Sequence, residues 1–326
     1  MMLNNTKIKV LFLDTVHPIL EDQLLNMGFK CEHDYKSDRR TILKKIHNYE
    51  GLIIRSRIKI DKEFLAAASN LKFIGRSGAG LENIDCKEAE NKGIQLFSAP
   101  EGNRQAVGEH AVGMILSLFN KISIADKEIR SGKWNREANR GIELSGKTIG
   151  IIGYGNTGKA FAKCLSGFNC KVLAYDKYKK NFSDECVQES SLENIQNKSD
   201  IISFHTPYNE DTHHYLNESF IKKMNKPFFI INTARGKVIN TSDLIKGLKS
   251  KKIQGACLDV LEYEKASFEN TFSEKIDENF QYLLSCKNIL FSPHVAGWTY
   301  ESYEKLSTVL ADKIECYYNS NKHLST

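Results

Sequence analysis

The chain has 326 residues, of which 41% are hydrophobic and 26% charged, and its formal net charge is +6. This composition excludes an intrinsically disordered chain and is sufficient for two domains, each with its own core. Basic and acidic residues are interleaved, and the strongest basic cluster, at 177–180, is too short for a nucleic-acid-binding surface. We therefore expect no nucleic-acid partner.

Targeting and metal-binding signals are not found in the sequence. The first residues lack the apolar core of a signal peptide, and no apolar run reaches the roughly 18 residues that a membrane span requires. The eight cysteines form no CxxC pair and no cysteine–histidine pair at metal-binding spacing. We expect free thiols, no metal site, no membrane partner and a cytoplasmic location.

Short apolar runs alternate with helical patterns over the first hundred residues. A helix is predicted from Pro18 through Met27, and further helical segments lie near Phe64 and Cys86. Strands are predicted at 8–13, 51–55, 71–75 and 94–97. This alternation indicates a parallel sheet covered by helices, and Ala99-Pro100 ends it.

A second α/β series begins at Lys147, after a single long helix predicted from Arg104 to Arg130. Six strands are predicted in this series, at 148–152, 171–175, 200–204, 228–231, 255–258 and 288–291. Six strands separated by helices favour one doubly wound sheet. A closing helix is predicted from about 299 to 318. The whole chain is therefore predicted to be α/β, with two Rossmann-like or flavodoxin-like parallel sheets.

A glycine motif follows the first strand of the second series. Gly153, Gly155 and Gly158 form G-x-G-x-x-G between an apolar strand and a helix, and Asp176 ends the next strand 18 residues later. This context is typical of a dinucleotide site, in which the glycines admit a tight turn and the pyrophosphate meets the helix N-terminus. The Asp176 carboxylate would accept hydrogen bonds from the ribose and repel a 2′-phosphate, which favours NAD over NADP, although Lys177 follows it directly.

Polar residues stand directly after four predicted strands of this series. They are His205-Thr-Pro207, Asn232-Thr-Ala-Arg235-Gly236, Asp259 and Ser292-Pro-His294. Ligands of open α/β sheets bind outside the carboxyl ends of the strands, so we expect these residues to line one crevice at the nicotinamide. Hydride transfer from a hydroxyl-bearing carbon needs a base, a carboxylate that orients this base, and a cation for the substrate carboxylate. Among the nine histidines His294 is the best candidate for the base, and His205 is its rival.

The motifs, in this order, resemble the D-isomer-specific 2-hydroxyacid dehydrogenases, and most closely the phosphoglycerate dehydrogenase branch. The resemblance covers nearly the whole chain. It rests on Ile54-Arg-Ser-Arg57, Gly75-Arg-Ser-Gly-Ala-Gly80-Leu-Glu-Asn-Ile-Asp85, Glu101-Gly-Asn103, Glu109-His110, Gly132-Lys-Trp134, the glycine motif, Asn232-Thr-Ala-Arg-Gly236, Leu258-Asp-Val-Leu-Glu-Tyr-Glu264 and Ser292-Pro-His-Val-Ala-Gly297.

The resemblance implies a catalytic set of Arg235, Glu264 and His294. Arg235 would bind substrate, His294 would be the acid/base, and Glu264, five residues after Asp259, would support it. The family commonly has proline after this glutamate, where Lys265 stands here, so Glu262 stays open as an alternative partner. A second departure is Thr157, where the family often has an aliphatic residue.

The resemblance also implies an NAD-binding set and a substrate-binding set. The cofactor residues are Gly153, Gly155, Asn156, Thr157, Gly158, Asp176, His205, Thr206, Pro207, Thr212, Thr233, Ala234, Asp259 (at the nicotinamide amide) and Gly297. The substrate residues are Arg55, Ser56, Ala79, Gly80, Asn103 and Arg136.

In the family's fold the substrate domain is discontinuous. We expect substrate-binding segments at 1–101 and 297–326, an NAD-binding domain at 102–296, and a homodimer formed through the helix after Asn103. Because the sequence stops at Thr326, soon after its last predicted helix, we expect no appended regulatory domain and no inhibition by serine.

The predicted reaction is NAD-dependent hydride transfer at C2 of a D-2-hydroxy acid. The leading substrate is 3-phosphoglycerate, the starting point of serine biosynthesis, with Arg55, Arg57 and Arg136 as cations for its phosphate. The alternatives are a glyoxylate/hydroxypyruvate or D-lactate-type reductase and, more remotely, a non-enzymatic NAD-sensing co-repressor. A formate dehydrogenase is disfavoured because such relatives place an amide beside the histidine.

Overall fold

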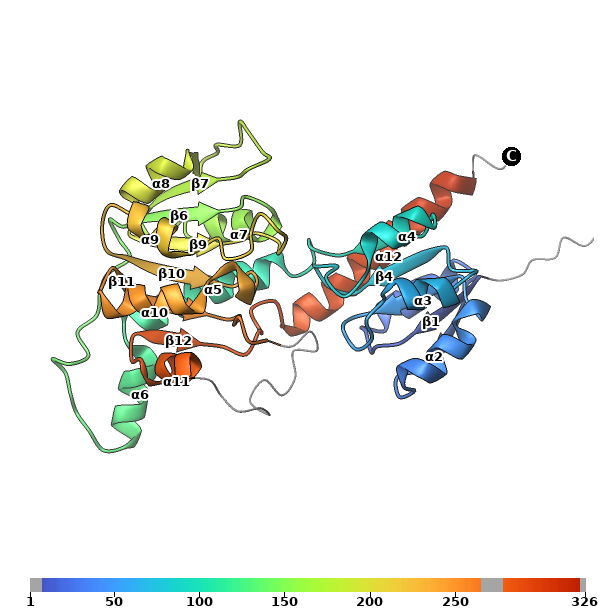
Figure 1. The fold of residues 1–326 in the computed structure, drawn as a ribbon, viewed down its shortest axis with the longest axis horizontal. Helices are drawn as coiled ribbons and strands as arrows, with labels where there is room; N and C mark the ends of the chain where they lie inside the picture. The colour runs from blue at the N-terminus through green and yellow to red at the C-terminus, as the bar shows by residue number, and fades with distance from the viewer. Residues whose placement is uncertain (1–7, 265–277, 323–326) are drawn as a thin grey trace, which may run out of the picture. The chain divides into compact units, whose positions relative to one another are not determined.

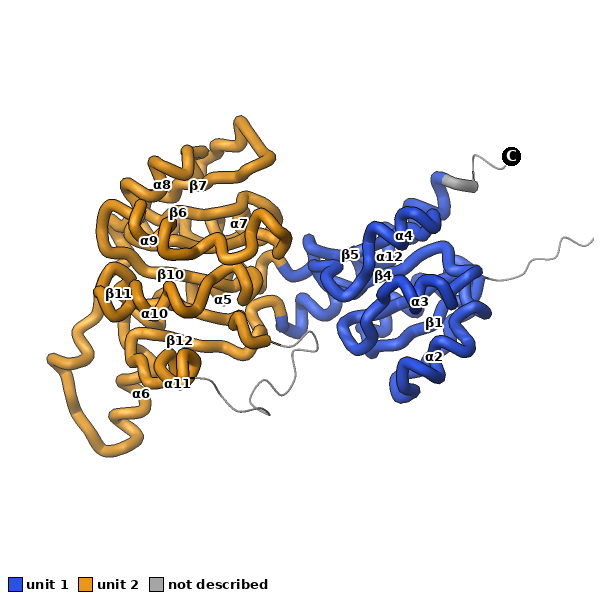
Figure 2. Tube along the Cα trace, viewed as in Figure 1, with its two compact units in different colours: residues 1–103, 298–326 blue, residues 104–297 orange. Residues whose placement is uncertain are grey.

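The computed structural model describes residues 8–264 and 278–322. It divides into two compact units, shown in Figure 2. Unit 1 contains residues 1–103 and 298–326, and unit 2 contains residues 104–297. The chain therefore leaves unit 1 after Asn103, builds the whole of unit 2, and returns at Trp298.

Unit 1 has a five-stranded parallel sheet with the strand order β2-β1-β3-β4-β5, which is the flavodoxin-like order. Its strands are β1 (Lys9–Phe12), β2 (Lys30–His33), β3 (Gly51–Ile54), β4 (Phe73–Arg76) and β5 (Gln95–Ser98). Its helices are α1 (Ile19–Asn26), α2 (Arg39–Lys45) with the 3-10 turn η1 (Ile46–Asn48), α3 (Lys62–Ala67), α4 (Cys86–Asn91) and α12 (Tyr300–Lys322).

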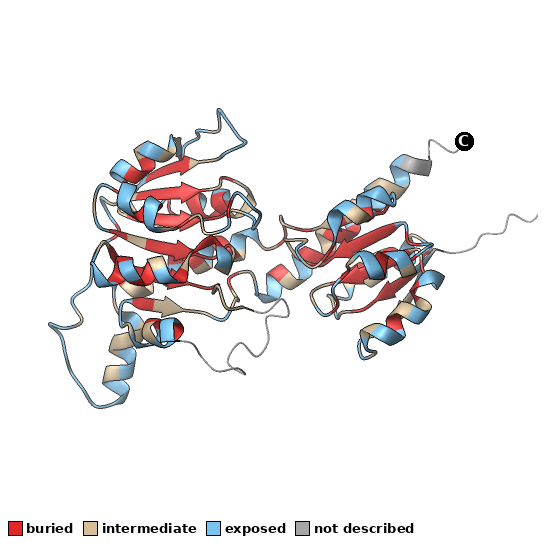
Figure 3. Cartoon of the chain, viewed as in Figure 1, coloured by how far each residue is buried: buried red, intermediate tan, exposed pale blue. Residues whose placement is uncertain are grey.

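The short helices of unit 1 begin at aspartates, and its core is closed by the last helix of the chain. Asp38, Asp61 and Asp85 each accept a hydrogen bond from the backbone N–H three residues on, which satisfies a donor that a helix end leaves unpaired. Leu310 and Ile314 of α12 are fully buried in the same cluster as strand residues of the sheet. Figure 3 shows both sheets as buried layers between helices that expose one face.

Unit 2 has a seven-stranded parallel sheet with the order β12-β11-β10-β9-β6-β7-β8, a doubly wound Rossmann-type arrangement (Figure 1). Its strands are β6 (Thr148–Ile152), β7 (Lys171–Tyr175), β8 (Gln188–Glu189), β9 (Ile201–Phe204), β10 (Phe228–Asn232), β11 (Ile253–Leu258) and β12 (Ile289–Phe291). Its helices are α5 (Arg104–Phe119), α6 (Ile122–Arg130), α7 (Asn156–Cys164), α8 (Leu192–Lys198), α9 (Glu218–Lys223), η2 (Gly236–Val238), α10 (Thr241–Lys249) and α11 (Glu278–Ser285).

The predicted fold class is confirmed, with three corrections to the elements. The single long helix predicted from Arg104 to Arg130 is wrong: it is two helices, α5 and α6, separated at Lys121, which has a left-handed φ of 52°. A left-handed residue cannot continue a right-handed helix. Strands β2 and β8 were not predicted, because both are sheet edges without a buried apolar run. No helix in the described part of the chain is long and apolar enough to cross a membrane.

Candidate active site

The glycine motif forms the turn between β6 and α7, and its geometry requires glycine. Gly153 has a φ of +94°, a left-handed conformation that side chains rarely adopt. A Cβ on Gly158 would lie 2.2 Å from the carbonyl oxygen of Gly153, so this position also excludes a side chain. Gly155 is the residue that precedes α7, whose first residues are Asn156 and Thr157. The backbone can thus approach a ligand at the start of this helix.

Two buried threonine hydroxyls, that of Thr206 beside this turn and that of Thr233 after β10, support the fit of this edge of the sheet to NAD. The side-chain oxygens of Thr206 and Thr233 are buried and have no hydrogen-bond partner among the described residues. The Thr206 methyl group lies 3.0 Å from the position of a Cβ on Gly153, so its hydroxyl is at the glycine turn. Buried polar atoms without partners are costly in a native structure. A polar ligand over this turn would supply a partner for the Thr206 hydroxyl, and one that extends along the carboxyl edge of the sheet would also supply one for Thr233.

Other predicted cofactor residues shape the loops around the turn. The Thr212 hydroxyl donates to the carbonyl of Pro207 at 2.7 Å and closes the loop after β9. Ala234 is buried and donates its N–H to the side chain of Asn232 at 3.1 Å. Gly297 is the last residue of unit 2. These residues hold loops at the carboxyl edge of the sheet.

Asp176 directly follows β7, and its carboxylate organises the glycine turn. Its carboxylate accepts hydrogen bonds from the backbone N–H groups of Tyr154 at 2.8 Å, Tyr178 at 2.9 Å and Lys179 at 3.0 Å. Burial alone would raise the pKa of Asp176, but these amides and the charge of Lys179 outweigh it and lower the pKa. The carboxylate is therefore held ionised. The Lys177 ammonium is ion-paired with the Asp211 carboxylate at 2.7 Å.

His205, the rival for the catalytic base, is buried under the glycine turn. Its Nε2 lies 2.8 Å from the Ser203 hydroxyl and its Nδ1 lies 3.3 Å from the Thr157 hydroxyl. Burial lowers the pKa of His205 to about 3. An imidazole that stays neutral across the working pH range and is enclosed by protein is poorly suited to proton transfer with substrate. The unusual Thr157 is the hydrogen-bond partner of this histidine.

Arg235 lies on the turn after β10. Asn232, at the end of the strand, donates from its side chain to the Arg235 carbonyl at 3.0 Å. Arg235 Nη1 donates to the Ala234 carbonyl at 2.7 Å, which orients the guanidinium. A Cβ on the following Gly236 would lie 1.8 Å from the carbonyl oxygen of Leu261. This contact packs the arginine turn against the turn that carries Glu264.

Glu264 and His294 form a partly buried pair. Glu264 Oε2 lies 2.7 Å from His294 Nδ1, and the side chains are 16% and 24% exposed. The other carboxylate oxygen, Oε1, accepts the backbone N–H of Leu261 and so closes the turn. His294 adopts a left-handed φ of 56°. Lys265, the departure from the family pattern, lies outside the described residues.

Glu262, the alternative partner, is engaged elsewhere. Its Oε1 lies 2.6 Å from His214 Nε2, and its Oε2 accepts the backbone N–H of Thr241 at 2.9 Å. Burial raises the pKa of Glu262, and the hydrogen bonds from Thr241 and His214 lower it to a net value below the ordinary range. The structure therefore brings Glu264, and not Glu262, to His294.

Asp259, predicted at the nicotinamide amide, is only 1% exposed at the end of β11. Its carboxylate accepts from the Ser292 hydroxyl at 2.6 Å and from the backbone N–H groups of Val295 and Ala296, both at 2.9 Å. The acceptor positions of this carboxylate are thus used to hold the loop around His294. Its predicted contact with the cofactor stays a prediction.

Four predicted substrate residues of unit 1, Arg55, Ser56, Ala79 and Gly80, lie in the loops that follow β3 and β4, and Asn103 lies between β5 and α5. Arg55 and Ser56 follow β3. The guanidinium carbon of Arg55 is 4.2 Å from the centroid of the Trp298 ring, which is a cation–π contact. Burial lowers the pKa of Arg55, and the charge of Asp14 partly offsets this effect. The Asn103 side-chain oxygen is buried without a hydrogen-bond partner among the described residues.

Arg76 is a buried residue at this edge that the sequence analysis did not assign. It is 8% exposed, and its Nε donates to the carbonyl of Arg55 at 3.0 Å. Its Nη1 donates to the carbonyl of Gly80, at the end of the loop that contains Ala79. The sequence signal that could have identified Arg76 is a charged residue at the end of an otherwise apolar strand. Arg76 thus fixes the loop predicted to bind the substrate carboxylate.

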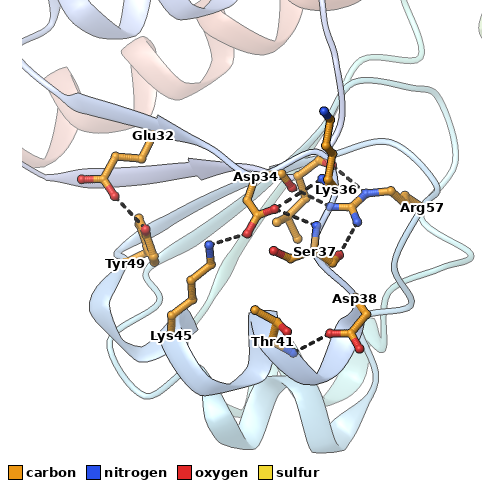
Figure 4. A network of polar contacts seen from close by, with 10 residues as sticks. Glu32, Asp34, Lys36, Ser37, Asp38, Thr41, Lys45, Tyr49 and Arg57 are labelled. Atoms are coloured by element: carbon orange, nitrogen blue, oxygen red, sulfur yellow. Dashed lines mark hydrogen bonds and ion pairs between the residues drawn. The ribbon is translucent and has the colours of Figure 1, made fainter.

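Arg57, which was predicted to be a cation for a phosphate, forms hydrogen bonds within unit 1 (Figure 4). Its guanidinium donates to the carbonyls of Leu13 at 2.9 Å, Ser37 at 2.7 Å and Asp34 at 2.7 Å. These bonds tie three loops of unit 1 together. The assignment of Arg57 to a phosphate is therefore not favoured by the structure.

Arg136 is exposed and lies in the segment that follows α6. Figure 1 shows this segment on the side of unit 2 where the strands of its sheet begin. In agreement, Gly146, at the end of the segment, donates its N–H to Asn169, just before β7, at 2.9 Å. The turns that carry Arg235, Glu264 and His294 lie at the opposite, carboxyl edge of the same sheet.

The described residues contain no group of three or more metal-ligating side chains.

Comparison with known proteins identifies the family. The sequence profile of the D-isomer specific 2-hydroxyacid dehydrogenase NAD binding domain matches residues 112–296. A hydroxypyruvate reductase of Thermotoga maritima is 36% identical over 277 residues, covering 85% of this chain and 87% of the relative. A D-3-phosphoglycerate dehydrogenase of Archaeoglobus fulgidus is 32% identical over 309 residues, which cover 94% of this chain. The chain spans 56% of that relative's length.

A solved structure extends the likeness to both units. The D-lactate dehydrogenase from Aquifex aeolicus complexed with NAD and lactic acid has a TM-score of 0.83 and 26% identity. The match covers 97% of this chain and 96% of that protein. The family profile, the relatives and the fold agree, and the chain belongs to the D-isomer-specific 2-hydroxyacid dehydrogenases, a family of NAD-dependent oxidoreductases.

Proposed function

We propose that the chain interconverts a D-2-hydroxy acid and its 2-keto acid, with His294 as the acid/base, Glu264 as its partner and Arg235 as the substrate-binding cation. The observation that carries the proposal is the 2.7 Å contact between Glu264 Oε2 and His294 Nδ1. The Arg235 turn packs against the Glu264 turn through Gly236, so both groups belong to one edge of the sheet.

The geometry of the pair assigns the proton path. An ionised carboxylate only accepts, so the hydrogen between the two groups belongs to Nδ1, and proton exchange with the C2 oxygen is assigned to Nε2. In oxidation, neutral His294 takes the hydroxyl proton, and Glu264 stabilises the imidazolium that forms. In reduction, the imidazolium returns this proton to the C2 oxygen.

NAD, when bound, supplies the acceptor or the donor of the hydride at C2. The residues that would hold it are those of the glycine turn, the hydroxyls of Thr206 and Thr233, and the Asp176 carboxylate. Arg235 would bind the substrate carboxylate and polarise the C2 carbonyl through its fork of donors. For unit 1 we propose a carboxylate-binding role for Arg55, Ser56, Ala79, Gly80 and Asn103.

For the substrate we propose a small 2-keto acid of the glyoxylate or hydroxypyruvate type. The observation that favours it is the use of Arg57 by three backbone carbonyls, which removes one of the cations that a phosphate would need. The test is a panel of 2-keto acids with NADH consumption as the measurement. We expect turnover with glyoxylate or hydroxypyruvate at ordinary enzyme rates. No turnover with any member of the panel would instead favour a non-enzymatic, co-repressor-like protein.

A second candidate substrate is 3-phosphoglycerate, and the exposed Arg136 is the residue that would distinguish it. Because the segment that contains Arg136 lies at the edge of unit 2 opposite the turns that carry Arg235, Glu264 and His294, we propose that Arg136 reaches substrate only from a second copy of the chain.

Under this second candidate, Arg136→Ala should raise KM for 3-phosphoglycerate by about 10-fold or more and leave KM for glyoxylate unchanged, since only the phosphate loses a charge-assisted contact of about 1.5–3 kcal/mol. Arg130→Ala, which removes a nearby exposed cation paired with Asp126, is the matched control. Equal changes of KM for both substrates, or no activity with 3-phosphoglycerate, would leave the small 2-keto acid as the proposed substrate.

We also propose that the chain is a homodimer formed through unit 2. Helix α6 buries none of its residues within the unit, and Ile122 and Ile129 are 55% and 53% exposed. Trp134 and Ile142 in the following segment are 79% and 41% exposed. Several large exposed apolar side chains in one helix and the segment after it are typical of a protein–protein interface. We refer to these four residues as the α6 surface.

A further inference from the structure

A hydrogen-bonded chain of three side chains runs from helix α5 to the loop that carries His294. His110 Nε2 on α5 lies 2.9 Å from the Ser292 hydroxyl oxygen. The same hydroxyl donates to Asp259 Oδ1 at 2.6 Å. His110 Nε2 is 3.7 Å from that carboxylate oxygen, so the three groups form one compact cluster inside unit 2.

The direction of the hydrogen bonds follows from the chemistry of the groups. The Asp259 carboxylate receives three donors, the Ser292 hydroxyl and the N–H groups of Val295 and Ala296, and therefore acts only as an acceptor. Ser292 has one hydrogen and gives it to Asp259. His110 must therefore donate from Nε2 to the Ser292 oxygen. A side chain without a donor at position 110 would remove the hydrogen bond to Ser292.

The series of hydrogen bonds ends at a strained turn, beyond Asp259. His294 adopts a left-handed φ of 56°, a conformation that costs roughly 1–2 kcal/mol for a residue with a side chain. Its backbone N–H donates to the Asp259 carbonyl at 2.8 Å, and the next two residues are bound by the Asp259 carboxylate. Strained residues persist where the surrounding contacts determine their conformation. Asp259 and Ser292 supply those contacts.

Helix α5 supplies the anchor for the cluster. It packs against both β11 and β12, the strands that lead into Asp259 and Ser292. Met114, one helical turn after His110, places its sulfur 3.7 Å from the Ser292 oxygen. One face of α5 thus contacts Ser292 from two positions. The side chain of His110 is 28% exposed and that of Asp259 is 1% exposed, so the inner part of the cluster is shielded from water.

We infer that His110 is a positioning residue for catalysis: through Ser292 and Asp259 it fixes the left-handed turn that presents His294 to Glu264. The inference rests on the proposed acid/base role of His294. If the donor at His110 is lost, Ser292 reorients, the Asp259 carboxylate loses a partner, and the His294 ring samples orientations away from its partner. The glycine turn between β6 and α7 and the Asp176 carboxylate, which are proposed to hold the cofactor, do not include His110 or Ser292, so NADH affinity should be preserved.

The experiment compares His110→Leu, which removes the donor, with His110→Gln, whose amide nitrogen can donate from nearly the same place. Turnover is measured with the best substrate of the keto-acid panel, together with NADH affinity by fluorescence and the melting temperature. We expect His110→Leu to lower kcat by about 5- to 30-fold with NADH affinity within twofold, and His110→Gln to restore most of the loss. Ser292→Ala should reproduce the loss independently. His47→Leu, at an exposed histidine of unit 1, is the control.

A double variant separates positioning from a general loss of structure. When His294 is already replaced by alanine, adding His110→Leu should lower kcat by less than a further twofold, because there is no longer an imidazole to position. Full additivity of the two losses, or loss of NADH affinity together with kcat, would overturn the inference. If His294→Ala itself keeps native turnover, the proposed acid/base fails. If His294→Ala is inactive and His110→Leu is fully active, only the positioning role fails.

Discussion

At the scale of single residues, the proposed acid/base chemistry depends on His294 and Glu264. We expect His294→Ala to lower turnover by about 10²–10⁴-fold, which is the usual contribution of a positioned acid/base. Initial rates with NADH and a saturating keto acid measure this loss. His205→Ala is the informative comparison, because His205 is buried and bonded to Ser203 and Thr157. Near-native turnover of His294→Ala together with an inactive His205→Ala would reverse the assignment.

Glu264→Gln should lower kcat by about 10- to 100-fold, because a charge-assisted hydrogen bond of about 1.5–3 kcal/mol to the imidazole is lost. The contact removed is that between Glu264 Oε2 and His294 Nδ1 at 2.7 Å. Initial rates with NADH and a saturating keto acid measure the loss. Glu262→Gln is the matched control, because Glu262 contacts His214 instead. An unchanged kcat in Glu264→Gln would mean that the pair is not coupled in catalysis.

His205 should make the stability of the protein depend on pH. Its folded-state pKa is lowered to about 3, whereas an unfolded histidine titrates near 6.5. As the pH falls below 6.5 the unfolded state binds a proton that the folded state does not, so stability decreases, by about 2 kcal/mol at pH 5 from this residue. Urea unfolding at pH 7.5 and pH 5 should show a smaller decrease for His205→Gln than for the native chain. Equal decreases would show that His205 is protonated in the folded protein.

At the scale of elements, the β6–α7 turn and the end of β7 should set the choice of cofactor. Asp176 is held ionised and would repel a 2′-phosphate. We expect kcat/KM to be far higher with NADH than with NADPH, and Asp176→Ala to narrow the gap. NADH affinity should also fall, since the Tyr154 amide loses its acceptor. Lys177→Ala should change little, because Lys177 pairs with Asp211. Comparable use of both cofactors by the native enzyme would refute this assignment.

The elements that sequence analysis predicted are those with a buried apolar face. Strands β6 and β7 have the predicted bounds, because each is a run of apolar residues between turn signals. The edge strands β2 and β8 lack such a run, since their residues face solvent on at least one side. The break between α5 and α6 at Lys121 has no glycine or proline to mark it.

The site was predictable where chemistry and spacing agree and not where distant segments meet. The glycine turn, Arg235 and the choice of Glu264 follow from local motifs and from the resemblance of these motifs to the family. The link from His110 to Ser292 joins residues separated by 182 positions, and no local pattern indicates it. The use of Arg57 by Leu13, Ser37 and Asp34 is likewise a consequence of the fold.

At the scale of the whole molecule, the α6 surface should determine the oligomeric state. We expect light scattering at micromolar concentration to give twice the mass of one chain, and Ile129→Asp to give single chains, because a charge would be buried in the interface. Leu25→Asp, at a residue of α1 that is 48% exposed, is the control and should stay dimeric. A native protein that is monomeric at this concentration would exclude the proposed interface.

The nesting of unit 2 within unit 1 reverses the usual order of folding during synthesis. Domains generally fold in the order in which they leave the ribosome. Here the sheet of unit 1 emerges first, but Leu306, Leu310 and Ile314, which complete its core, follow the whole of unit 2. The newly made strands of unit 1 therefore have one apolar face only partly covered, by α1, until unit 2 and then α12 have been synthesised. The period of greatest exposure to chaperones and to aggregation should belong to the part of the protein that is made first.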